Sequence, residues 1–212
     1  MNMNCLICGV GGQGVILASR LIAAAALEIG EKVLTAETIG MAQRGGSVVS
    51  HVRVGAQAHS PLVPQGKADL IIALEPAEAV RAMNYLKPGG TVVVSCKAVK
   101  PATPAPVNLA YTGEEMLEHL RATVKNLYIV DTPAICAAAD SDRAANIALL
   151  GAAAASGALG FSLEQIEAAI RAQTRAKYFE SNKIALQLGA EAAVNANSAE
   201  EAGRGAGLGA KL

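Results

Sequence analysis

Two glycine-rich segments contain the residues best suited to hold an anionic ligand. In the first, Gly9, Gly11 and Gly14 have the spacing G-x-G-x-x-G, with Gly12 and Gln13 between them. Backbone amides of such a turn, together with the amino terminus of a following helix, can bind phosphate groups. The spacing therefore predicts a phosphate- or nucleotide-binding turn, and the alternative is that its glycines only permit tight packing of a strand against a helix.

The second segment is Gln43-Arg44-Gly45-Gly46. Adjacent glycines expose backbone amides and permit positive φ, and the Arg44 guanidinium is a planar, permanently charged partner for phosphate or carboxylate. The segment follows a predicted strand, so we expect it at the same edge of the sheet as the first. The alternative is a flexible connection with a solvated arginine.

One carboxylate supports a different ligand. Glu37 follows Gly14 by 23 residues, near the end of a predicted strand. Proteins that bind NAD place the acid for the ribose hydroxyls at about this distance from the glycine turn. A free-standing NAD(P)-binding protein is therefore one alternative function.

Cysteines and histidines give little indication of a complete active site. Cys5 and Cys8 form a C-x-x-C, but in an extended strand they point to opposite faces, so we expect both to be buried hydrophobic side chains. The cysteine spacing does not fit an iron–sulfur cluster.

The histidines do not indicate a catalytic site. His51 is predicted to be structural rather than catalytic, and His59 and His119 are predicted to be solvated. No Ser-His-Asp arrangement is recognisable, which favours a subunit over a complete enzyme.

Composition excludes several classes of partner. The 212 residues have zero formal net charge, a pI of about 6.8, and 3% aromatic residues with no tryptophan. A nucleic-acid-binding or anionic-membrane-binding protein would carry a basic surface. No apolar run approaches the ~20 residues of a transmembrane helix, and the first residues lack the basic start of a signal peptide. We therefore expect a cytoplasmic protein.

The order of predicted elements indicates an α/β fold. Strands are predicted at residues 4–9, 32–37, 47–54, 69–74, 91–95 and 127–131, with a turn at 87–90. Helices are predicted at residues 13–27, 76–85, 114–123, 143–158, 162–171 and 176–188. We predict a Rossmann-like layered sandwich with a mixed, mainly parallel sheet and a helical C-terminal third. Residues 1–189 would form a single domain, and 190–212 a mobile tail.

Several sequence motifs, taken together, resemble those of a known family. The motifs lie at residues 9–15, 40–53, 60–64, 68–79 and 146–152, together with Glu37. Over residues 4–189 the chain resembles the gamma subunits and domains of 2-oxoacid:ferredoxin oxidoreductases, and within them the beta subunits of indolepyruvate ferredoxin oxidoreductases. The two glycine segments followed by Ser50-His51-Val52-Arg53 are the most specific part of the match.

The resemblance implies a subunit that shares its reaction with a larger partner. Thiamine diphosphate, Mg²⁺ and [4Fe-4S] clusters would lie on an alpha subunit, with none bound tightly here. The complex would decarboxylate indolepyruvate or another arylpyruvate oxidatively, reduce ferredoxin and form an acyl-CoA. Residues 9–14 and 43–46 would contact coenzyme A or the partner. A third possibility is a purely structural subunit whose glycines serve packing alone.

Overall fold

The computed structural model describes residues 1–38, 45–99 and 111–208, without the side chains of residues 197–208. The strands are β1 (Met3–Val10), β2 (Val33–Thr38), β3 (Ser47–Val54), β4 (Ala68–Ala73), β5 (Leu86–Ser95) and β6 (Asn126–Val130). The helices are α1 (Val15–Glu28), α2 (Pro76–Ala82), α3 (Glu114–Thr123), α4 (Thr132–Ala138), α5 (Ala145–Ala155), α6 (Leu163–Gln173) and α7 (Phe179–Leu208), with short 3₁₀ turns at Met83–Tyr85 and Ala176–Tyr178. None of the described helices is long and apolar enough to span a membrane.

The six strands of the described residues form one sheet in the order β2-β3-β1-β4-β5-β6. Strands β1, β4, β5 and β6 are parallel, whereas β3 pairs antiparallel with both β1 and β2. Eight residues separate the end of β2 from the start of β3, fewer than the dozen or so that the crossover of a parallel pair requires. The predicted mixed, mainly parallel sheet is confirmed.

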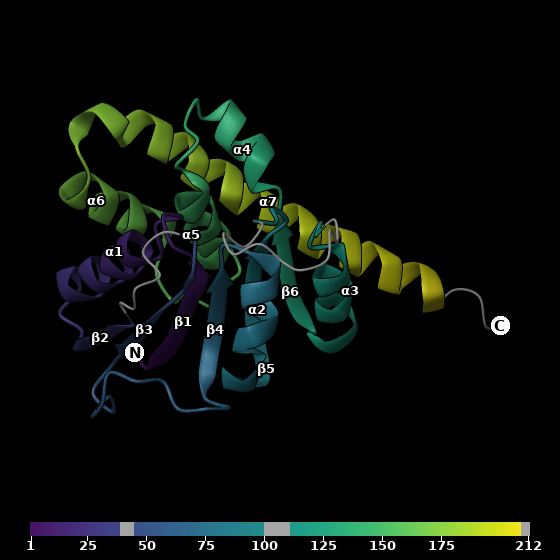
Figure 1. The fold of residues 1–212 in the computed structure, drawn as a ribbon, viewed down its shortest axis with the longest axis horizontal. Coiled ribbons are helices and arrows are strands. Elements are labelled where there is room, and N and C mark those ends of the chain that lie inside the picture. The colour runs from purple at the N-terminus through teal and green to yellow at the C-terminus, as the bar shows by residue number, and fades with distance from the viewer. Residues whose placement is uncertain (39–44, 100–110, 209–212) are drawn as a thin grey trace.

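Helices cover both faces of the sheet, which gives three layers (Figure 1). Helices α1, α5, α6 and α7 build the larger core on one face, and α2 and α3 build a smaller core on the other. Cys5 belongs to the larger core and Cys8 to the smaller, and both are fully buried, as predicted. Burial in these apolar surroundings raises the pKa of both thiols.

Helices α5 and α7 of the C-terminal third pack closely against each other. A Cβ atom added at Gly189 would lie 1.9 Å from the carbonyl oxygen of Ala148, and one at Gly151 would lie 2.0 Å from that of Leu186. The two backbones are therefore in direct contact at both glycines. This contact places α5, which is almost wholly buried, between the sheet and α7.

Three elements differ from the prediction. Helix α4 was not predicted, although Asp131 caps it by accepting from the Ala134 amide at 3.1 Å and Pro133 stands in its first turn. Strand β5 begins at Leu86, so the predicted turn at 87–90 lies within a strand. Helix α7 continues to Leu208, far beyond the predicted end at 188. Residues 190–208 are thus helical, while the mobility of 190–212 stays a prediction.

Candidate functional site

The first glycine turn joins β1 to α1 and contacts Gly46 of the second glycine segment. The Gly11 amide donates to the Gly46 carbonyl at 2.8 Å. Gly12, Gly14 and Gly45 have φ values of 99°, 89° and 80°, a region that favours glycine. Gly45 and Gly46, the described part of the second segment, therefore lie beside the first turn, as predicted. Gln43 and Arg44 lie outside the described residues.

Gln13 belongs to the scaffold of this turn. Its Oε1 accepts from the Val10 amide at 2.6 Å, and its Nε2 donates to the Leu74 carbonyl at 3.0 Å. A Cβ atom at Gly9 would lie 2.9 Å from the same Oε1, so the glycine leaves room for this side chain. Gln13 thus ties the end of β1 to the end of β4. The strands that follow β1 in the chain, β2 and β3, lie on one side of it in the sheet, and β4 lies on the other side. Open α/β folds bind ligands at such a change in strand order.

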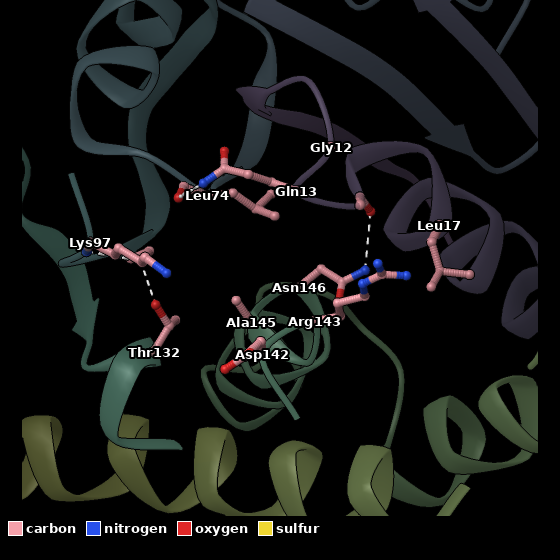
Figure 2. A pocket seen from close by; sticks show the side chains of 12 residues that line it. Gly12, Gln13, Leu17, Leu74, Lys97, Thr132, Asp142, Arg143, Ala145 and Asn146 are labelled. Atoms are coloured by element: carbon pink, nitrogen blue, oxygen red, sulfur yellow. Dashed lines mark hydrogen bonds between the residues drawn. The ribbon is translucent and has the colours of Figure 1, made fainter. Parts of the chain in front are cut away.

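A cleft of about 260 Å³ opens at this point (Figure 2). Its walls come from the segments that follow β1, β4, β5 and β6 and from the start of α5. The lining residues are Gly12, Gln13, Gly14, Leu17, Leu74, Ser95, Lys97, Thr132, Asp142, Arg143, Ala145 and Asn146. A second hollow of about 190 Å³ shares Lys97, Thr132, Asp142 and Ala145 with it. The two hollows are therefore adjacent, at the carboxyl ends of the parallel strands.

The cleft is electrostatically suited to an anion. Lys97 and Arg143 are exposed, and neither forms an ion pair with another residue of the described part of the chain. Figure 2 shows them on opposite sides of the cleft. Helices α1 and α5 both begin at its wall, and neither N-cap residue, Gly14 or Ala144, caps its helix with a side chain. Two helix amino termini and two cations outweigh the single lining carboxylate, Asp142.

Buried hydroxyl groups fix the wall that carries Lys97. The Ser95 and Thr132 side chains, each 1% exposed, share a hydrogen bond of 2.6 Å between Oγ and Oγ1. Ser95 Oγ also accepts from the Lys97 amide at 3.0 Å. The ends of β5 and β6 are therefore joined, and the backbone of Lys97 is held while its charged end stays exposed.

Two buried carboxylates, Glu75 and Glu78, bind the side chains of Ser47 and Tyr111 beside the glycine turns. Glu75 caps α2 through the Glu78 amide at 3.0 Å and accepts from the Tyr111 hydroxyl. Glu78 accepts from Ser47 Oγ at 2.5 Å and pairs with Arg81. Burial and the adjacent Glu75 carboxylate raise the pKa of Tyr111. Because these carboxylates are satisfied by protein donors, they position Ser47 and Tyr111 and are not free acids or bases.

Glu37 does not lie where a ribose-binding acid would be. Strand β3 separates β2 from β1, so the end of β2 is one strand further from the glycine turn than in an NAD-binding fold. The Glu37 carboxylate instead accepts from Ser19 Oγ of α1 at 3.3 Å. This geometry does not support the NAD(P)-binding alternative.

The histidines have structural or solvated positions. His51 is 5% exposed, accepts from the Val63 amide through Nδ1 at 3.1 Å, and packs edge-on against Tyr85. Burial lowers its pKa, which favours the neutral ring that this hydrogen bond requires. His59 and His119 are exposed, as predicted. In the described ranges, no three His, Cys, Asp or Glu side chains gather in an arrangement that could hold a metal ion.

Sequence reasoning missed Lys97, Thr132, Arg143 and Asn146. They come from separate segments, and only the strand order brings them to one cleft. A usable signal was present: Thr132 is the first residue and Lys97 the second residue after a predicted strand, and Arg143 and Asn146 stand at a predicted helix start. The carboxyl ends of parallel strands are where α/β proteins bind their ligands.

Comparison with known proteins gives consistent matches along the chain. The family model described as pyruvate ferredoxin/flavodoxin oxidoreductase matches residues 4–192. The indolepyruvate oxidoreductase subunit IorB of Archaeoglobus fulgidus is 37% identical, with 92% of this chain and 97% of that protein covered. The subunit of the same name from Thermococcus kodakarensis is 36% identical, with 90% and 95% covered. The crystal structure of a keto/oxoacid ferredoxin oxidoreductase gamma subunit from Geobacter sulfurreducens is 25% identical, with a TM-score of 0.66 and 91% and 99% covered.

Proposed function

Because this chain belongs to the pyruvate ferredoxin/flavodoxin oxidoreductase family, we propose that it is the small subunit of a ferredoxin-dependent 2-oxoacid oxidoreductase acting on indolepyruvate or another arylpyruvate. The nearly complete overlap with two indolepyruvate oxidoreductase subunits supports this substrate class. The reaction would be oxidative decarboxylation to an acyl-CoA, with ferredoxin as electron acceptor.

The redox and decarboxylation cofactors are assigned to a larger alpha subunit. Thiamine diphosphate would supply the decarboxylation chemistry there, with Mg²⁺, and [4Fe-4S] clusters would carry electrons to ferredoxin. The donor set of this chain does not fit a cluster, because Cys5 and Cys8 are buried in cores on opposite faces of the sheet. Its own residues are left to bind the partner and a co-substrate.

We assign the cleft between α1 and α5 to the anionic part of coenzyme A. Coenzyme A carries a pyrophosphate and a 3′-phosphate. The starts of α1 and α5, whose N-cap residues make no side-chain cap and which are flanked by Lys97 and Arg143, suit such groups. This arrangement is the observation that carries the proposal. The cleft is smaller than a whole drug-sized ligand requires, so part of the molecule would extend toward the partner.

The residues of the two glycine segments divide into two proposed roles. Gly12 and Gly14 line the cleft, where their positive φ directs the chain around the ligand. Gly11 and Gln13 hold the turn in place through hydrogen bonds to Gly46, Val10 and Leu74. Gly9 leaves room for the Gln13 side chain. Gln43, Arg44, Gly45 and Gly46 remain proposed coenzyme A or partner contacts, as the sequence predicted.

Arg44→Ala tests the role of the second glycine segment. If the guanidinium binds a phosphate of coenzyme A, the variant complex should show a KM for coenzyme A raised by about tenfold, with kcat little changed. The measurement is steady-state ferredoxin reduction with coenzyme A as the varied substrate. The control is Arg121→Ala on α3, which removes an exposed arginine paired with Glu114. An unchanged KM with weaker assembly would favour a packing role.

A further inference from the structure

A single buried side chain joins the two helix starts at the cleft. Asn146, 1% exposed, lies in the first turn of α5 and donates from Nδ2 to the Gly14 carbonyl at 3.1 Å, across 132 residues of sequence. Figure 2 shows this bond at the wall of the cleft. The same carbonyl accepts the first hydrogen bond within α1, from the Ala18 amide at 3.0 Å. Asn146 therefore contacts the point where α1 begins.

The site accepts little other than asparagine. Asn146 Oδ1 accepts from the Ile147 amide at 2.9 Å, so both ends of the side-chain amide are used. A Cβ atom added at Gly14 would lie 2.5 Å from Asn146 Nδ2, which shows how closely the side chain approaches the turn. Aspartate would place an acceptor against the Gly14 carbonyl, and alanine would leave that contact unmade.

We propose that Asn146 is a positioning residue for the anionic ligand. By holding the start of α5 against the start of α1, it keeps the amino termini of both helices at one location between Lys97 and Arg143, while its own Oδ1 occupies the Ile147 amide. This inference rests on the proposed function of the cleft. Hydrogen-bond donors that are already in position before the ligand binds give tighter binding, because donors that must reorganise lose part of the binding free energy.

The test compares Asn146→Ala with Asn126→Ala in the purified complex. Asn126 is a matched control, because its Nδ2 also donates to a glycine carbonyl, that of Gly89 at 2.9 Å, at the opposite end of the parallel strands. The measurements are kcat and the KM values for coenzyme A and for indolepyruvate. Asn146→Ala should raise the KM for coenzyme A by about tenfold, with the other two constants within about twofold, and Asn126→Ala should change none of them.

Asn146→Ser extends the test should Asn146→Ala fail to assemble. Serine keeps a donor at this position but with a shorter reach, so its KM for coenzyme A should lie between those of wild type and the alanine variant. Equal changes in both KM values, an unchanged KM, or failure of both variants to assemble would overturn the positioning role. Lys97→Ala distinguishes failure of the Asn146 role from failure of the proposed cleft function. If Lys97→Ala raises the KM for coenzyme A while Asn146→Ala does not, only the positioning role of Asn146 fails. If neither variant changes that KM, the proposed cleft function fails.

Discussion

Replacing Lys97 and Arg143 together by alanine should raise the KM for coenzyme A by about a hundredfold, with kcat within about twofold of wild type. Each exposed cation is assigned one charge-assisted contact with a phosphate, worth roughly tenfold in affinity. The two residues lie on opposite sides of the cleft, so their effects should be nearly additive. Contacts made equally in the bound substrate and in the transition state affect KM and leave kcat unchanged.

Ionic strength provides a second measurement on the same variant. Because Lys97 and Arg143 are exposed, added salt should weaken coenzyme A binding to the wild-type complex. The double variant should lose much of this dependence. The control is Arg121→Ala/Lys125→Ala, which removes the same formal charge from the α3–β6 region. The assignment of the cleft is wrong if the Lys97/Arg143 variant matches that control in both KM and salt dependence.

Gly189→Ala should destabilise the chain by about 3 kcal/mol or more, near the upper end of overpacking effects. The new methyl carbon would lie 1.9 Å from the Ala148 carbonyl oxygen, a backbone atom that cannot rotate away. Helix α7 would have to move away from α5, whose Leu149 and Leu150 are fully buried in the larger core. The measurement is the free energy of unfolding from urea titration.

Gly30→Ala separates steric conflict from backbone strain. Gly30 has a φ of 77°, but a Cβ atom there meets nothing within 4 Å. Its cost should be only the ~1–2 kcal/mol of a left-handed conformation for an L-residue. A Gly189→Ala variant as stable as Gly30→Ala would show that α5 and α7 are not in direct backbone contact.

Much of the fold could be predicted because local patterns agree with it. Continuous apolar runs at β1 and β4 are typical of buried parallel strands. The short connection between β2 and β3 favours antiparallel pairing, because eight residues are too few for a parallel crossover. A capping box of Ser162 and Gln165, which lie three residues apart in the sequence, begins α6. In each case the determining interaction lies within a few residues of sequence.

The cleft could not be predicted in the same way because it depends on strand order. The spacing of Glu37 after the glycine turn fits NAD binding only if β2 lies next to β1, and insertion of β3 between them removes that adjacency. Lys97 and Arg143 become neighbours of the turn only when β5 and α5 are placed in space. The length of α7 was missed because its alanine- and glycine-rich sequence has no clear apolar period.

Isolation of the tagged chain after co-expression with its genomic neighbours tests the central claim most directly. We expect a coloured, cluster-containing complex with a larger subunit, which reduces ferredoxin only when indolepyruvate or another arylpyruvate and coenzyme A are both supplied. Ultraviolet–visible spectra of the complex and ferredoxin reduction in the absence of each substrate give the result. The proposed function is contradicted if the chain is recovered colourless and without a partner, and if this isolated chain binds NADH tightly.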